Sequence, residues 1–370
     1  MRDVLADLVR WHAEGGVGGV GGTSGLATVV RTWSSAPRQP GASMAVSPGG
    51  EVVGSVSGGC VEGAVYDQAL EVVASGRPVV ATYGVSDDDA FAVGLTCGGV
   101  LEVFIEPLDA GRFPQLPEVA ASVGAGEGVA VATVVGGPGE LGGKLAVWAD
   151  RASGGLGSQR LDDAVTDDAR GLLEQGVTTV AHYGPAGERR GDELAVFVES
   201  FAPPPRMIVF GAIDFAAAVA RVGKFLGYRV TVCDARPVFA TERRFPEADE
   251  VVVDWPHRYL AATEVDERTV VCVLTHDPKF DEPVLKVALR TSAAYVGAMG
   301  SRRTHADRLR RLREAGMSEA ELARLSSPIG LDIGARTPEE TAVSIAAEIV
   351  ASRWGGSGRR LTATEGPIHP

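Results

Sequence analysis

Four short patterns occur twice, in the same order, within the first 200 residues of the chain. They are LATVV (26–30) and VATVV (131–135), VEGAVYDQA (61–69) and LDDAVTDDA (161–169), ATYG (81–84) and AHYG (181–184), and VFIE (103–106) and VFVE (196–199). Each match alone is weak, but four in register, two of them at one offset, indicate a degenerate internal repeat. We therefore expect one fold unit built twice, with copies at about 24–108 and 129–200.

A proline run divides the chain into two parts. The segment FAPPPR (201–206) stands between the strand-like stretches LAVFVES and MIVF, as a stiff linker would. Before it, strand-like runs surround one predicted helix at about 61–74, which predicts an α+β domain over 1–200. After it, strands and helices alternate, which predicts a Rossmann-like, doubly wound parallel sheet over 207–354. The last residues, 355–370, are expected to form a flexible tail.

Charge and cysteine content exclude several classes of protein. The 48 acidic side chains outnumber the 35 lysines and arginines, for a formal net charge of -13, which argues against general nucleic-acid binding because that binding depends on cations at phosphates. No apolar run reaches membrane-spanning length, and the start MRDVLADLVRWHAEGG does not resemble a signal peptide. We expect a cytoplasmic protein with no membrane partner.

The four cysteines include no CxxC pair, so neither a disulfide framework nor a structural zinc site is indicated.

The repeat serves as an internal control for the cysteines of the N-terminal half. Ser57–Cys60 falls opposite Gly157–Arg160, and Cys97 falls near Arg190. The second copy therefore lacks both thiols and most of the glycines while keeping the helix. Because the fold unit does without them, a functional role gains weight over the alternative, a buried cysteine in a tight turn.

The first candidate site is the turn GSVSGGCVEG, where a strand-like run gives way to a helix. Glycines let the backbone approach a ligand, and the unpaired N–H groups of a first helical turn suit an anion and favour a thiolate. The candidate binding residues here are Ser57, Gly58, Gly59, Cys60 and Glu62.

Two further N-terminal features join this candidate site. Cys97 and Gly98 lie in GLTCGG, a second cysteine-glycine turn that could converge with the first on one ligand. Thiolates are soft donors that suit a soft metal or a sulfur-bearing centre, whereas two cysteines without a histidine match zinc catalysis poorly. Arg38 in APRQPGASM could reach a phosphate, and a solvated loop arginine is an equally good interpretation.

The C-terminal half begins with the layout of a dinucleotide-binding unit. MIVFGAIDFAAAVARVGKFLGYRVTVCDARP reads as strand, glycine turn, helix, strand and acid, with Asp234 at the distance of a ribose-binding carboxylate. Gly211 keeps the first glycine of the fingerprint, but Ile213 and Ala216 replace the second and third. A side chain at the second position obstructs a pyrophosphate, so the pattern favours the Rossmann-like fold more than NAD(P) binding.

Other strand ends are predicted to reach the same edge of that sheet. His276 and Asp277 follow one strand, and Gly300, Ser301 and Arg302 stand between another strand and a helix. Parallel sheets bind ligands at this edge, and a Gly-Ser turn at a helix start suits phosphate. His276 can equally be a turn residue. The arginines beyond Arg303 are expected on a solvated helix face, and the helix after the Thr337–Glu340 capping box is expected to be core.

As a set, these motifs resemble the XdhC/CoxI family of maturation factors for molybdenum hydroxylases of the xanthine dehydrogenase and carbon monoxide dehydrogenase type. The resemblance rests on SAPRQPGASM, GSVSGGCVEGAVYDQA, GLTCGG, THDPKFDEP, AYVGAMGSRRTHADRL and SPIGLDIGARTPEETAVSIAAEI. It implies a protein that binds molybdenum cofactor (molybdopterin, with or without a nucleotide), protects it during sulfuration and delivers it to the apo-enzyme. Cys60, with Cys97 as a second ligand, would lie near molybdenum. The departure is GAIDFA, where the family usually has Gly-Ala-Gly-His.

Three functions follow from these observations. The first is a cofactor-binding chaperone rather than an enzyme. In it, Cys60 and Cys97 contact the molybdenum end of the cofactor, and Ser301 and Arg302 hold its phosphate or nucleotide tail. Its partners would be an apo molybdenum hydroxylase and a cysteine desulfurase, and the repeat is compatible with a homodimer. The alternative is an NAD(P)-dependent oxidoreductase with His276 and Asp277 as acid and base. The third is a scaffold between the hydroxylase and its sulfurase.

Overall fold

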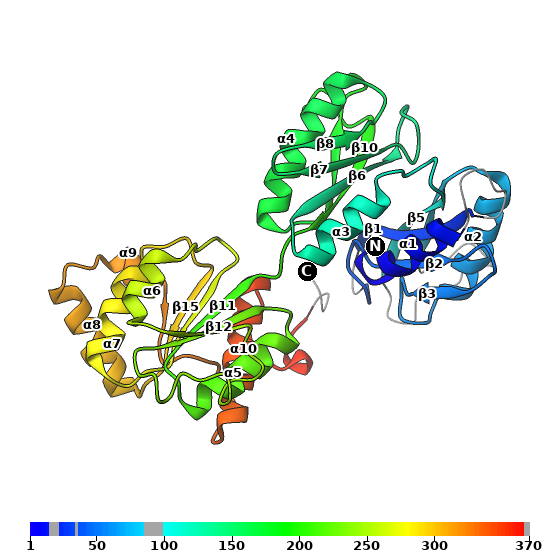
Figure 1. The fold of residues 1–370 in the computed structure, drawn as a ribbon. Coiled ribbons are helices and arrows are strands. Elements are labelled where there is room, and N and C mark those ends of the chain that lie inside the picture. The colour runs from blue at the N-terminus through cyan, green and yellow to red at the C-terminus, as the bar shows by residue number, and fades with distance from the viewer. Residues whose placement is uncertain (15–21, 34–35, 85–98, 366–370) are drawn as a thin grey trace. The chain divides into compact units, whose positions relative to one another are not determined.

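The computed structural model describes residues 1–14, 22–33, 36–84 and 99–365 of the chain (Figure 1). The chain divides into two compact units, with a boundary between Pro203 and Pro204 and with Thr364 as the last residue of the second unit. The strand β10 ends at Phe201 and β11 begins at Arg206, so the proline run joins two strands. Among the described residues, no helix is both long and apolar enough to cross a membrane.

The N-terminal unit contains two antiparallel sheets of identical strand order, β3-β2-β1-β5-β4 and β8-β7-β6-β10-β9. The first copy consists of β1 (Ser24–Trp33), β2 (Ser43–Val46), β3 (Val52–Gly54), α2 (Glu62–Ser75), β4 (Val79–Tyr83) and β5 (Val100–Leu108). The second consists of β6 (Val129–Gly136), β7 (Lys144–Trp148), β8 (Ala152–Gly154), α4 (Gln159–Gln175), β9 (Thr179–Tyr183) and β10 (Leu194–Phe201). The four repeated patterns fall on counterpart elements, so the predicted internal repeat is confirmed.

The copies keep the same helix-to-sheet packing because the same apolar spacing recurs. In α2, Val65, Ala69 and Val72 are buried, and in α4, Val165 and Ala169 occupy the counterpart positions. This spacing of three and four residues puts the apolar side chains on one face of a helix. Each helix covers one face of its sheet.

The two copies also share a core. The elements η1 (Arg2–Val4), α1 (Leu5–Glu14) and α3 (Leu116–Ala125) contribute to one cluster that contains strand residues of both copies. A smaller cluster joins Val30 and Phe104 of the first copy to Val135 and Phe197 of the second. The two copies therefore form a single folded body.

The C-terminal unit is a parallel six-stranded sheet of order β13-β12-β11-β14-β15-β16. Its strands are β11 (Arg206–Phe210), β12 (Arg229–Asp234), β13 (Glu250–Val253), β14 (Val270–Val273), β15 (Tyr295–Ala298) and β16 (Leu325–Ser326). Its helices are α5 (Asp214–Phe225), α6 (Pro256–Ala262), α7 (Pro278–Ala288), α8 (Arg302–Glu314), α9 (Glu319–Leu322) and α10 (Pro338–Trp354), followed by η2 (Leu361–Ala363). This is the Rossmann strand order.

Helices cover both faces of this sheet, as predicted (Figure 1). Met207 and Val209 of β11 join a core cluster with α5 and α10, whereas Ile208 and Phe210 join a second cluster with α6, α7 and α8. Alternate residues of one strand thus supply the two cores, as strand geometry requires. The capping box of Thr337 and Glu340 starts α10, whose Ile345 is buried, so the predicted core helix is confirmed.

Candidate functional site

The SGGC turn lies between β3 and the start of α2. Gly58 and Gly59 have φ angles of 83° and 120°, a region that favours glycine. A Cβ added at either residue would meet no atom within 4 Å. Their role is therefore conformational, and the backbone at this turn faces open space.

One carboxylate holds the turn together. Glu62 accepts hydrogen bonds from the N–H groups of Ser57 (2.9 Å), Gly58 (3.0 Å) and Gly59 (2.8 Å). It also accepts from the hydroxyls of Ser55 and Ser57, both at 2.6 Å. The backbone donors expected to bind an external anion are thus engaged by a side chain of the same turn.

The environment of Glu62 keeps it ionised. Burial raises its pKa, but the hydrogen bonds from Ser55 and Ser57 outweigh that effect and lower the pKa to about 2. The turn therefore contains a fixed negative charge at neutral pH.

Cys60 is half-buried and packs against the core of the first copy. Its backbone N–H donates to the hydroxyl of Ser57 (3.0 Å), which is itself buried. The other described cysteines, Cys233 and Cys272, are buried, and burial raises the pKa of both thiols to about 12. Cys60 is therefore the described thiol best placed to meet a ligand.

The second copy builds a different turn at the counterpart position. There α4 begins at Gln159, with the Ser158 hydroxyl as its N-cap, so Arg160, the counterpart of Cys60, already lies within the helix. Asp162 replaces Glu62 and accepts one backbone hydrogen bond, from Leu156 (2.7 Å). The glycine turn and its carboxylate clamp belong to the first copy.

The predicted partner thiol, Cys97, lies outside the described residues, together with Gly98. Within the described parts of the chain, no group of three or more His, Cys, Asp or Glu side chains is arranged to hold a metal ion. Arg38 lies between β1 and β2, half-exposed, and donates to Asp3 at 3.3 Å.

The predicted ribose-binding acid of the C-terminal unit is engaged within the protein. Asp234 is 2% exposed and accepts hydrogen bonds from the Ala212 N–H (2.8 Å) and from the Arg236 guanidinium (2.8 and 2.9 Å). Burial raises the pKa of this carboxyl, but the hydrogen bonds from Arg236 and Ala212 outweigh that effect, so the pKa lies below its usual value. Asp234 thus links the glycine turn to the end of β12.

The turn after β11 requires glycine at position 211. Gly211 has a φ angle of 108°, and a Cβ there would lie 2.9 Å from Thr275 Cγ2.

The other predicted residues of this unit lie at the same sheet edge. His276 is exposed on the turn after β14, and Asp277 caps α7 by accepting from the Lys279 N–H (3.0 Å). Gly300, with φ of 153°, precedes Ser301, which caps α8. The side chains of Ser301 and Arg302 are exposed. Topology thus brings the predicted turns to one edge and leaves these side chains open to a ligand.

One expectation for α8 is wrong. Arg308, expected on a solvated face, is 1% exposed. Its guanidinium donates to Asp281 (2.9 Å), the Ser327 hydroxyl (2.9 Å) and the Met299 carbonyl (2.8 Å). Asp281 also accepts from the Thr275 hydroxyl. The stretch RRTHADRLRRLR is polar throughout, so the sequence did not indicate that Arg308 is buried. The available signal was its spacing, because Arg308 stands four residues before the buried Leu312 and so lies on the inward face of the helix.

The fold and the site define a class of two-unit proteins, in which a duplicated α+β unit carries a clamped thiol turn and is followed by a Rossmann-type unit. The model described as "XdhC and CoxI family" matches residues 19–84 and 122–184, one segment in each copy. The model described as "XdhC Rossmann domain" matches residues 207–349. The chain belongs to the XdhC/CoxI family.

Similar proteins include two from bacteria. One, from Bacillus subtilis (strain 168), is named as a probable xanthine dehydrogenase component and is 28% identical over 332 residues, 89% of this chain and 92% of the relative. "Molybdenum cofactor insertion chaperone PaoD" from Escherichia coli (strain K12) is 29% identical over 328 residues, 89% of this chain and 83% of PaoD. A crystal structure described as a xanthine dehydrogenase from Bacillus halodurans matches with a TM-score of 0.67 and 25% identity, over 97% of this chain and 98% of that one.

Proposed function

We propose that this protein is a maturation factor that binds molybdenum cofactor as cargo and delivers it to an apo molybdenum hydroxylase of the xanthine dehydrogenase type. The observation that carries the proposal is the Cys60 turn, a half-buried thiol on an open glycine turn that the second copy does not reproduce. The names of the two relatives support the same role.

In this proposal the residues of the turn have separate tasks. Cys60 supplies a soft sulfur donor to the molybdenum end of the cargo. Glu62 engages the backbone donors, so the turn is rigid before the cargo arrives and less ordering is required on binding. Cys97 and Gly98 are proposed as a second contact.

The Rossmann-type unit is proposed to bind a phosphate or nucleotide group through Ser301 and Arg302, which are exposed at the carboxyl edge of its sheet. NAD(P) oxidoreduction is less well supported, because Asp234 is engaged by Ala212 and Arg236. Isothermal titration with NAD(H) and NADP(H) separates the two functions, since micromolar binding with turnover would favour the oxidoreductase.

The test of the proposal is cofactor loading of the purified protein. Molybdenum is counted by mass spectrometry and pterin by fluorescence after oxidation, in wild type, Cys60→Ala and Arg160→Ala. We expect Cys60→Ala to lose at least about 90% of the cargo, as for the loss of a donor worth more than about 1.4 kcal/mol, and Arg160→Ala, at the counterpart position, to keep it. Undiminished loading of Cys60→Ala would remove Cys60 from the mechanism.

Delivery is tested with the client. We expect an apo-hydroxylase matured with this protein and a cysteine desulfurase to contain more molybdenum and sulfido sulfur than one matured without it. Co-purification with the hydroxylase but no cargo on either protein alone would instead support a scaffold.

A further inference from the structure

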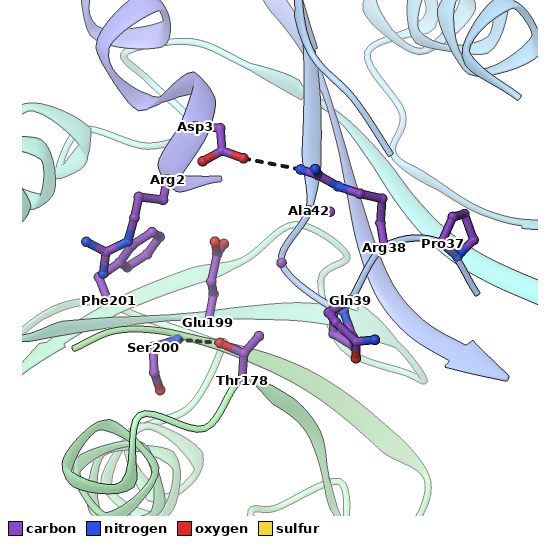
Figure 2. Close-up of a pocket in the computed structure, with 12 residues that line it drawn as sticks. Arg2, Asp3, Pro37, Arg38, Gln39, Ala42, Thr178, Glu199, Ser200 and Phe201 are labelled. Atoms are coloured by element: carbon purple, nitrogen blue, oxygen red, sulfur yellow. Dashed lines mark hydrogen bonds and ion pairs between the residues drawn. The ribbon is translucent and has the colours of Figure 1, made fainter. Parts of the chain in front are cut away.

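A hollow of about 440 Å³ lies between the two copies of the N-terminal unit. Its walls are residues 2–3 and 37–42 on one side and Thr178 with 199–201 on the other. Figure 2 shows the side chains of Arg2, Arg38 and Glu199 around this space. Its volume is in the range of small-molecule sites, which often lie between folded units.

The repeat explains why the two copies differ here. On the opposite side of the pseudo-symmetric pair, Glu106 is covered by Lys144, whose Nζ lies 2.6 Å from Glu106 and 3.1 Å from the Thr133 hydroxyl. The counterpart of Glu106 is Glu199, and the counterpart of Lys144 is Ser43, which pairs with Thr28 in β1 as Lys144 pairs with Thr133 in β6. The first copy therefore offers no lysine to cover Glu199.

The carboxylate of Glu199 is nevertheless neutralised. The Met1 ammonium lies 2.6 Å from Glu199 Oε1, and both side chains are at most 10% exposed. The charged groups left along the walls are Arg2, Arg38 and Asp3, a balance of one positive charge in a chain of net charge -13. The hollow is thus a local site for an anion.

Counted over the described residues, each of the two guanidiniums makes one hydrogen bond and retains donors for such an anion. Arg2 donates one hydrogen bond, to the Ala202 carbonyl (3.0 Å), and lies over the Phe201 ring at 5.6 Å, which fixes its position. Arg38 donates one, to Asp3, and because both of these side chains are more than a third exposed, the pair is weak. A guanidinium has five donors, and the Gln39 side-chain amide has no hydrogen-bond partner among the described residues.

We propose that this hollow binds the phosphate group of a small molecule, with Arg2 as a fixed contact and Arg38 as a contact that exchanges Asp3 for the ligand. Guanidinium and phosphate match in geometry as well as charge. If the proposed function holds, on which this step rests, the site would hold the phosphate of the cargo in the same unit as Cys60.

The test is isothermal titration of the intact protein with sodium pyrophosphate at low ionic strength. Wild type is compared with Arg38→Gln, Arg2→Gln and Arg10→Gln. Arg10 is the matched control, since it is a half-exposed arginine paired with the nearby Asp7 (2.7 Å) and does not line the hollow. We expect each of the two lining variants to weaken binding about tenfold, as for loss of one charged hydrogen bond, and Arg10→Gln to bind like wild type.

Three results would overturn the site: no pyrophosphate binding by wild type, equal weakening in all three variants, or unchanged binding in both lining variants. Thermal melts of the variants establish that each is folded. Pyrophosphate contains no molybdenum, so this titration measures the hollow separately from cargo loading. Pyrophosphate binding by a protein that never loads molybdenum would therefore support this site and reject the proposed function. Molybdenum loading by a protein that does not bind pyrophosphate would reject this site and support the proposed function.

Discussion

At the scale of single residues, Glu62 decides the shape of the thiol turn. Its carboxylate accepts from the N–H groups of Ser57, Gly58 and Gly59, so one side chain replaces the external anion that a helix start would otherwise attract. A turn that needs two glycines at positive φ has little conformational preference of its own. The hydrogen bonds to the Glu62 carboxylate supply that preference, and they fix the direction in which the side chain of Cys60 projects from the turn.

We expect Glu62→Gln to destabilise the N-terminal unit by about 1 to 2 kcal/mol, because the amide cannot accept all of these bonds and the donors of the buried Ser57 lose part of their pairing. Partial solvent access keeps the cost below the sum of the individual bonds. Urea unfolding measures it. Glu71→Gln, at an exposed position of the same helix, is expected to be neutral, and an equal loss in both variants would contradict the clamp.

The same carboxylate gives the turn a pH dependence. Hydrogen bonds from Ser55 and Ser57, acting against burial, lower the pKa of Glu62 from 4.5 to about 2. A depressed pKa contributes stability that is complete above pH 4.5 and is lost as the pH falls toward 2. The stability difference between wild type and Glu62→Gln, measured by urea unfolding, should therefore shrink across that window. A difference that stays constant from pH 6 to 3 would exclude this role.

The sequence was sufficient to predict part of this site. The repeat separated Cys60 from the requirements of the fold, because the second copy keeps the helix without the thiol. The orientation of Glu62 was not predictable, because whether a carboxylate points to solvent or back to its own turn depends on φ angles that glycine leaves open.

At the scale of elements, the buried pair of Asp281 and Arg308 connects the turns of the ligand edge. Arg308 on α8 contacts α7 through Asp281 and the end of β15 through the Met299 carbonyl. Asp281 in turn holds Thr275, which packs against Gly211. One ion pair thus fixes the turns after β11, β14 and β15 relative to each other.

Removing one partner of a buried ion pair leaves the other charge uncompensated. We expect Arg308→Met to lower the free energy of unfolding of the C-terminal unit by about 3 to 5 kcal/mol. Arg303→Met, on an exposed position of the same helix, should change it by less than about 0.5 kcal/mol. Urea unfolding followed by circular dichroism compares them, and similar values for the two variants would show that the pair does not stabilise this edge.

Elements themselves were more predictable than their contacts. The alternation of apolar strands with helices in the C-terminal half predicted a parallel sheet with both faces covered, and the capping box predicted the start of α10. Arg308 was missed because charge patterning shows where a polar face is expected but not which charge finds a buried partner from another helix. That depends on packing of distant segments.

At the scale of the whole molecule, the chain divides into two units with separate cores. The N-terminal clusters contain residues up to Ala202, and the C-terminal clusters begin at Met207. Each unit therefore buries its own apolar surface, which is the requirement for independent folding.

We expect residues 1–203 and 204–364, produced as separate chains, each to fold with a cooperative urea transition close to one seen in the full protein. Circular dichroism and urea unfolding of the two fragments and of the intact chain provide the comparison. A fragment that is unfolded alone, or an intact chain with one transition far more stable than either fragment, would show that the units depend on each other.

The segments 54–62 and 154–162 have equal length, and each runs from the end of a counterpart strand into a counterpart helix. The second copy is therefore a recipient into which the thiol turn of the first can be transplanted with no change of chain length. Such a chain would present the turn twice on a single scaffold, and its binding stoichiometry would report whether one turn suffices to hold a ligand or needs its neighbours. Because the N-terminal unit is duplicated, the segment 154–162 of the second copy is a position that can accept the thiol turn of the first.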